Sequence, residues 1–82
     1  MSIADEMFKN LGYSHNKRYE RCGYDDYVEF DIYTRQWRDD NIENIKIAYR
    51  YCKTNKTDFD YKELKAILQK MRENIEEYNE EE

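Results

Sequence analysis

The chain has 82 residues, of which 39% are hydrophobic and 40% charged, which is enough for one domain with one small core. Such a core leaves little room for a buried catalytic cavity, and no apolar run is long enough to span a membrane. The formal net charge is −5, and six glutamates without any basic residue lie between positions 73 and 82, which leaves +1 for the rest of the chain. Acidic tails of this kind repel nucleic acid and can attract a basic protein surface.

The first expected element is a short helix over residues 3–11. Ser2 is a good N-cap, and the acidic residues Asp5 and Glu6 fall in the first turn, where the helix dipole favours them. Gly12 stands where a left-handed residue commonly ends a helix. One apolar stripe recurs at helical spacing and is formed by Ile3, Met7, Phe8 and Leu11.

Two runs of sequence resemble small uncharacterised proteins of phages and prophages in low-GC Gram-positive bacteria. The first is Ala-Asp-Glu-Met-Phe at residues 4–8 followed by Leu-Gly-Tyr at residues 11–13, and the second is Glu-Leu-Lys-Ala-Ile at residues 63–67. The middle of the chain takes no part in the resemblance, and Glu-rich sequence stands where such proteins often close with Leu-Gly-Trp. The resemblance implies a phage origin, and it brings no catalytic residues with it.

The middle of the chain predicts strands. The clearest covers residues 27–33 and extends towards Trp37, because Val28, Phe30 and Ile32 alternate with residues of the opposite face. Residues 17–22 are highly charged but allow an edge strand.

The segment over residues 45–52 fits two periods. A helical stripe is present, but β-branched and aromatic residues dominate and the length suits a strand, so we expect a strand there and leave a helix open. Residues 53–58 are expected to form a polar connection into the last helix.

The last element is an amphipathic helix over residues 59–78. Asp60 and Glu63 have the spacing of a capping box, and Phe59 and Leu64 have that of a hydrophobic staple. The apolar positions recur at helical spacing, at Leu64, Ile67, Leu68, Met71, Ile75 and Tyr78.

Together these elements predict an α+β fold, a single small domain over residues 1–78 with the order α-β-β-β-α. An antiparallel three-stranded sheet would carry both helices on one face, and residues 79–82 would form an acidic C-terminal tail. The expected core consists of Met7, Phe8, Leu11, Val28, Phe30, Ile32, Ile45, Ile47, Tyr49, Leu64, Ile67, Leu68, Met71 and Ile75.

The chain offers few groups for catalysis. A zinc site would have to combine His15, Cys22 and Cys52 with a carboxylate, without the close paired spacings that such sites show. Turn chemistry accounts for the aspartate pairs at residues 25–26 and 39–40, which could otherwise hold magnesium or divide acid and base roles. We therefore expect no enzyme activity, no cofactor, no metal, free thiols and, because no signal peptide is visible, a cytoplasmic location.

The tyrosines suggest a binding surface. On the expected strands Tyr27 and Tyr33 face away from the helices together with basic residues at 35, 46 and 50, as in sheets on which single-stranded nucleic acid stacks. Glu29 and Asp31 would share that face and repel phosphate. A protein partner fits the same residues without this penalty, because Tyr and Arg are enriched at protein interfaces.

We therefore expect a phage-encoded accessory protein that inhibits a host defence nucleoprotein complex, as anti-CRISPR proteins do, by stoichiometric protein binding and with acidic residues that imitate nucleic acid. The defence target follows from what small phage proteins often do. The alternatives are a single-stranded nucleic-acid-binding module and a structural homo-oligomer, and a homodimer stays open. The expected partner-binding residues are Tyr27, Tyr33, Arg35, Trp37, Glu73, Glu76, Glu77 and Glu80.

Overall fold

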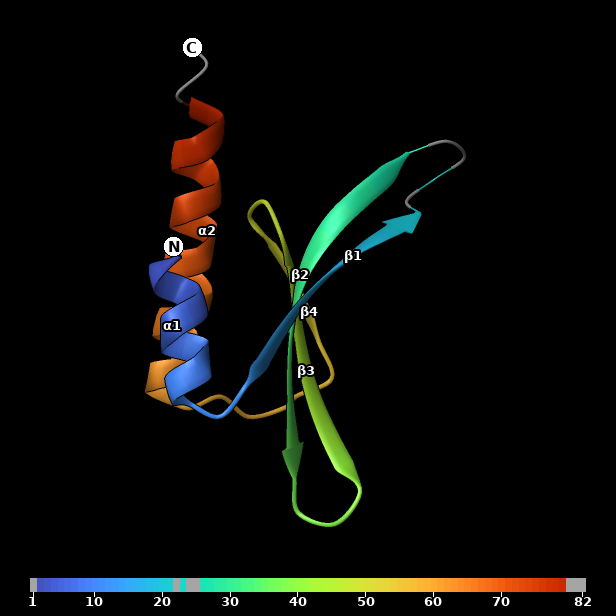
Figure 1. Cartoon of the computed structure of the whole chain (residues 1–82), viewed down its shortest axis with the longest axis vertical. Coiled ribbons are helices and arrows are strands. Elements are labelled where there is room, and N and C mark those ends of the chain that lie inside the picture. The colour runs from blue at the N-terminus through green and yellow to red at the C-terminus, as the bar shows by residue number, and fades with distance from the viewer. Residues whose placement is uncertain (1, 22, 24–25, 80–82) are drawn as a thin grey trace.

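Two helices and one antiparallel four-stranded sheet make up the computed structural model, which describes residues 2–21, 23 and 26–79. The strands lie in the order β1-β2-β3-β4, and both helices lie on the same side of the sheet (Figure 1). The elements are α1 (Ile3–Asn10), β1 (Ser14–Arg21), β2 (Tyr27–Trp37), β3 (Asn41–Ala48), β4 (Tyr51–Thr54) and α2 (Tyr61–Asn79). Within the described residues, neither helix combines the length and the apolar character needed to cross a membrane.

The ends of α1 follow the local sequence signals. The side chain of Ser2 accepts a hydrogen bond from the backbone N–H of Asp5 at 3.1 Å, which confirms the N-cap. Gly12 adopts a φ of +93°, and the N–H of Tyr13 donates to the carbonyl oxygen of Phe8 at 3.0 Å. This left-handed residue with its backward hydrogen bond ends the helix.

The start of α2 is a capping box, as its sequence predicts. The N–H of Asp60 donates to Glu63 Oε1 at 2.9 Å, and the N–H of Lys62 donates to Asp60 Oδ2 at 3.0 Å. The helix continues to Asn79, so the part of the expected acidic tail beyond that residue lies outside the described residues.

The expectation of three strands is wrong, because residues 45–52 form two strands rather than one. Ala48 pairs with Tyr51, so the chain reverses within the two residues Tyr49 and Arg50. Tyr49 has a φ of +52°, a backbone conformation that a tyrosine seldom adopts. No Gly, Asn or Asp marks this turn, so the sequence does not indicate it. The start of the expected polar connection belongs instead to strand β4.

The face of β2 that packs on the helices is the opposite of the expected one. Tyr33, rather than Phe30 and Ile32, is fully buried beneath the helices, where its ring stacks on Phe8 with centroids 3.8 Å apart. Tyr33 pairs with Ile45 of β3, which is also fully buried. The main core combines α1, the sheet and α2, through Phe8, Tyr13, Tyr33, Ile45, Ile47, Ala66 and Ile67.

The sheet face without helices has its own small apolar cluster. Phe30, Ile32 and Ala48 pack together there, with Val28 against them. Lys46 forms an ion pair with Glu20 at 2.8 Å on this side, and the ammonium of Lys53 lies 5.8 Å from the centre of the Phe30 ring. Long charged side chains therefore cover the cluster with their aliphatic stems.

Helix α2 presents to the core a different face from the one that its longest apolar stripe suggests. Buried positions are Glu63, Ala66, Ile67 and Lys70. Leu64 and Leu68, both expected in the core, are 45% and 60% exposed. The polar residues among the buried ones are accommodated by ion pairs with distant parts of the chain, which local periodicity does not reveal.

Candidate functional site

A cleft of about 540 Å³ opens between α2 and the outer parts of β1 and β2. The β1–β2 hairpin bends away from α2 towards its tip, so that the two sides diverge (Figure 1). The side formed by the strands carries Lys17, Tyr19, Tyr27 and Glu29, and the side formed by α2 carries Lys70, Asn74 and Glu77.

Two exposed tyrosines lie on the strand side of the cleft. Tyr19 and Tyr27 are each 66% exposed. Tyr19 pairs with Glu29, and Arg21 pairs with Tyr27, so the two tyrosines are diagonal neighbours on one face of the hairpin. Their rings are thus available to a partner without any rearrangement of the core.

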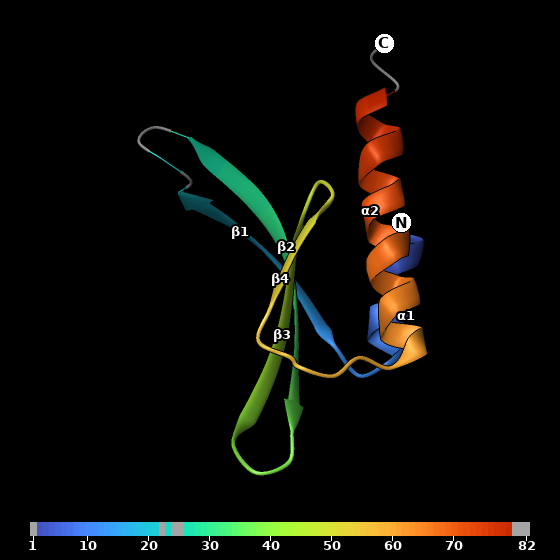
Figure 2. The same cartoon turned by 180° about the vertical axis from the view of Figure 1, so that it is seen from behind.

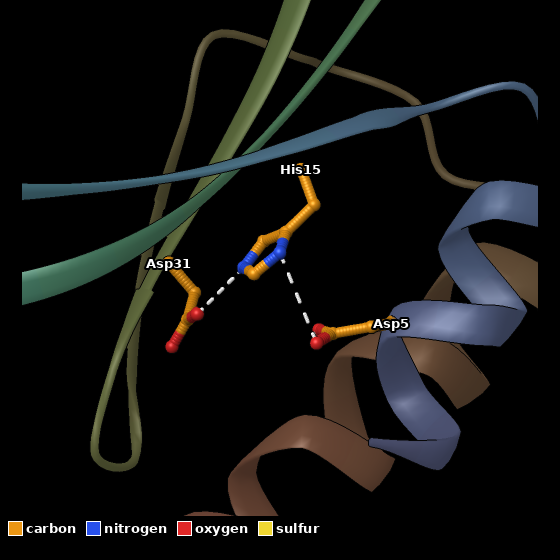
Figure 3. Close-up of side chains that lie close together, drawn as sticks. All are labelled: Asp5, His15 and Asp31. Carbon is orange, nitrogen blue, oxygen red and sulfur yellow. Dashed lines mark hydrogen bonds and ion pairs between the residues drawn. The ribbon is translucent and has the colours of Figure 1, made fainter. Parts of the chain in front are cut away.

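A cluster of Asp5, His15, Asp31 and Lys70 joins four elements beside the cleft, and Figure 3 shows the first three of these residues. His15 Nε2 lies 2.7 Å from Asp31 Oδ1, and His15 Nδ1 lies 3.8 Å from Asp5 Oδ2. The Lys70 ammonium lies 3.5 Å from Asp5 Oδ1 and 3.6 Å from Asp31 Oδ2. The cluster therefore ties α1, β1, β2 and α2 together through these contacts.

The hydroxyl of Tyr33 donates a hydrogen bond to Asp5 within the same cluster. Burial by itself raises the pKa of Asp5, but the Tyr33 hydrogen bond and the charges of Lys70 and His15 outweigh it and lower the pKa below 3.8. Burial, reinforced by the hydrogen bond to Asp5, raises the pKa of Tyr33. Asp5 is thus held as a carboxylate and Tyr33 as a neutral donor.

Asp5, His15 and Asp31 offer three ligand atoms within 4.8 Å of one another, which invites comparison with a metal site. However, the ammonium of Lys70 lies within 3.6 Å of both carboxylates and already supplies a positive charge to them. Both ring nitrogens of His15 also face carboxylates. A divalent cation would be repelled by Lys70, so the geometry fits an ion-pair network better than a metal centre.

A second buried network lies under the other half of α2. Glu63 accepts hydrogen bonds from the Tyr13 hydroxyl, from Lys56 Nζ at 2.8 Å and from Arg35 Nη2 at 3.3 Å. Glu43 pairs with the same two cations, so two carboxylates balance two positive charges. Burial raises the pKa of Glu63, but hydrogen bonds and ion pairs outweigh it and lower the pKa below 4.5. This network is part of the fold.

Two of the residues expected to bind a partner are therefore placed elsewhere. The expectation that Tyr33 faces away from the helices is wrong, since Tyr33 is in the core. Arg35 points towards the helices as well, where it pairs with Glu43 and Glu63. Tyr27 is exposed, but it too lies on the helix side of the sheet rather than on the expected face, where it lines the cleft.

The remaining expected residues are spread over the molecule. Glu73 accepts hydrogen bonds from Ser2, from the N–H of Ala4 at 2.9 Å and from Gln69, so its carboxylate holds α1 against α2. Glu76 and Glu77 are exposed, and Glu77 borders the cleft. Trp37 ends β2 at the end opposite to Tyr27, and Glu80 lies outside the described residues.

Tyr19, Lys70 and Asn74 are among the cleft residues that the sequence did not indicate as a binding surface. Tyr19 alternates with charged neighbours in an exposed strand, which is a weak signal for a binding surface. Lys70 and Asn74 gain their place from tertiary contacts, since Asn74 Nδ2 donates to the carbonyl oxygen of Tyr49 at 2.8 Å. Only the hairpin at Tyr49 brings that carbonyl to the helix.

The only cysteine that the described residues include, Cys52, is a half-buried free thiol whose pKa is raised by burial. Cys22 lies outside the described residues, so its expected free thiol is not placed. A raised pKa keeps Cys52 protonated and unreactive near neutral pH.

The cleft is thus the concave surface of this fold at which exposed aromatic and charged side chains of three elements converge. Comparisons with protein families, with curated proteins and with solved structures find no match to this chain. A functional assignment therefore has to start from the geometry of the cleft.

Proposed function

We propose that the chain is a non-enzymatic protein-binding module that holds its partner in the cleft between α2 and the β1–β2 hairpin. The observation that carries this proposal is the pair of tyrosines, Tyr19 and Tyr27, each 66% exposed on one face of the hairpin. Tyrosine provides a large, rigid contact area at low conformational cost and is enriched where binding energy concentrates.

The charges around the tyrosines define the chemistry of the occupant. Glu29 and Glu77 stand on opposite sides of the cleft against the exposed ammonium of Lys17, and the charge of Lys70 is engaged by Asp5 and Asp31. Aromatic rings beside carboxylates receive a guanidinium or ammonium group well, through cation–π contacts and charge-assisted hydrogen bonds. The occupant is therefore an arginine or lysine side chain on a loop of the partner.

The class of partner follows from this chemistry together with the sequence resemblance. Proteins that handle nucleic acid display arginine and lysine in grooves that bind phosphate. Glu76 is exposed as well, and the sequence contains three more glutamates at positions 80–82. A phage accessory protein that occupies the cationic groove of a host defence nucleoprotein complex, and so blocks nucleic acid stoichiometrically, accounts for these features.

Affinity capture tests the proposal. The tagged chain is incubated with a lysate of a low-GC Gram-positive host, beside the variant Tyr19→Ala/Tyr27→Ala and the control Tyr51→Ala. Tyr51 is 67% exposed on the helix-free side, so the control removes an equally exposed ring away from the cleft. The wild type and Tyr51→Ala should retain the same nucleic-acid-handling protein, and the cleft variant should lose it.

A competition step separates groove occupation from other modes of binding. Single-stranded DNA added to the captured complex should release the partner, because both ligands would use its cationic groove. Equal retention by all three forms, or a partner that nucleic acid does not displace, would contradict the proposal.

A further inference from the structure

Helix α2 carries an apolar seam that the rest of the fold leaves largely uncovered. The seam consists of Tyr61, Leu64, Leu68, Met71 and Ile75, of which the first three are exposed and the last two are partly buried. Met71 also packs against the edge of the core. In Figure 2, α2 lies in front of α1, and no other element covers its near side.

The spacing of the seam is that of a coiled coil. Its residues follow one another at alternating intervals of three and four, and Tyr78 continues the series in the sequence. Such a heptad pattern places all members on one narrow stripe that fits a second helix. Apart from Met71 at the edge of the core, the contacts of α2 with α1 and the sheet come mainly from another face, which carries Glu63, Ala66, Ile67 and Lys70.

We propose that a second copy of this chain covers the seam, with its α2 packed antiparallel to the first. The charges along α2 argue for this partner and this direction. The exposed charged residues of the first part of the helix are Lys62, Lys65 and Arg72, whereas the exposed charged residues that follow are Glu76 and Glu77. In an antiparallel pair the basic half of each α2 lies beside the acidic half of the other, and the two helix dipoles point in opposite directions. A parallel pair would place the glutamates of the two helices side by side, where they repel each other.

The seam is also complementary to itself under a twofold axis. When Leu68 lies opposite Met71 of the second copy, Leu64 lies opposite Ile75 of the second copy, and the same pairs recur on the other side of the axis. Lys65, which is exposed, then lies level with Asn74 of the second copy, two positions along the helix from both Glu76 and Arg72. One register therefore pairs Leu64, Leu68, Met71 and Ile75 of each copy with apolar residues of the other.

The dimer leaves the cleft free. Lys70, Asn74 and Glu77 line the cleft from another face of α2, turned from the seam towards the sheet. A dimer would thus present two clefts and could engage two sites of a partner assembly with increased avidity. The dimer does not depend on what the cleft binds.

Sedimentation equilibrium of the full chain over a range of concentrations tests the association. The variant Leu64→Gln/Leu68→Gln should raise the dimer dissociation constant by about tenfold or more, because both side chains are central in the seam. The control Ile42→Gln changes an equally exposed residue of β3 and should leave the constant unchanged. A wild-type monomer at millimolar concentration, or an equal loss in the control, would overturn the proposal.

Disulfide cross-linking tests whether the two α2 helices run antiparallel. The chain used for it carries Cys22→Ser and Cys52→Ser. Chains with Leu64→Cys should cross-link to chains with Ile75→Cys and not to one another, because an antiparallel pair separates the two copies of position 64 by about 16 Å along the helix axis. Efficient cross-linking between two Leu64→Cys chains would overturn the antiparallel arrangement.

Discussion

Neighbouring residues of α2 should differ sharply in their contribution to stability. Ile67 is 7% exposed and Leu68 is 60% exposed, although both lie on the apolar stripe that the sequence displays. Truncation of either to alanine removes three carbon groups, each worth about 0.8 kcal/mol when buried. For Ile67 the transfer cost is about 2 kcal/mol, and the cavity left in the core raises the total to about 3 kcal/mol. For Leu68 the cost is about 1 kcal/mol or less, because most of the side chain already meets water and no cavity forms.

Urea unfolding followed by circular dichroism measures this difference. Both variants are compared in dilute protein, where self-association does not add to the stability. Ile67→Ala should lower the free energy of unfolding by about 2 kcal/mol more than Leu68→Ala does. Equal losses in the two variants would show that α2 is rotated about its axis relative to this structure, and the assignment of the seam would then be wrong.

Three further predictions concern the polar networks and the thiol. Glu63→Gln should lower the free energy of unfolding in urea by about 2 to 3 kcal/mol, because Lys56 and Arg35 lose a buried carboxylate. A loss below about 0.5 kcal/mol, which is typical of a surface substitution, would contradict a structural role for Glu63. The pKa values of Asp5, Glu43, Glu63 and Glu73 lie below their ordinary values of 3.8 for Asp and 4.5 for Glu, so their stabilisation is complete above about pH 4.5 and is lost as the pH falls through the folded-state values. Such groups titrate between about pH 6 and pH 2, so a thermal midpoint that stays constant over this range would refute the prediction. Alkylation of Cys52 with iodoacetamide should be slow in the native protein and fast in urea, because burial raises the pKa of the thiol. Mass spectrometry measures both rates, and equal rates would contradict the prediction.

The helix ends could be predicted from sequence because their signals are local. Ser2, Gly12 and the pair Asp60 and Glu63 act on backbone groups within a few residues, and each forms the expected contact. Alternation in β2 likewise predicts a strand. It does not tell which face meets the helices, because both faces of β2 carry large apolar or aromatic residues, such as Phe30 on one and Tyr33 on the other.

The remaining differences arise from contacts between distant residues. The turn at Tyr49 lacks the residues that usually adopt a positive φ, so the sequence reads on as one strand. Lys70 occupies a buried position of α2 because Asp5 and Asp31 surround its ammonium, although charged residues usually mark the solvent side of a helix. The sequence singles out Tyr27 as an exposed strand residue but predicts the wrong face of the sheet for it, and the cleft itself depends on the bend of the hairpin away from α2.

The central claim is that the two tyrosines of the cleft hold the partner, and calorimetric titration of the captured protein tests it most directly. Tyr19→Ala/Tyr27→Ala should weaken binding by about a hundredfold or more, as expected for two aromatic anchors, whereas Tyr51→Ala should bind as the wild type does. Thermal unfolding of the three forms provides the control, since exposed rings contribute little to the fold. An unchanged affinity in the cleft variant, with the fold intact, would contradict the account.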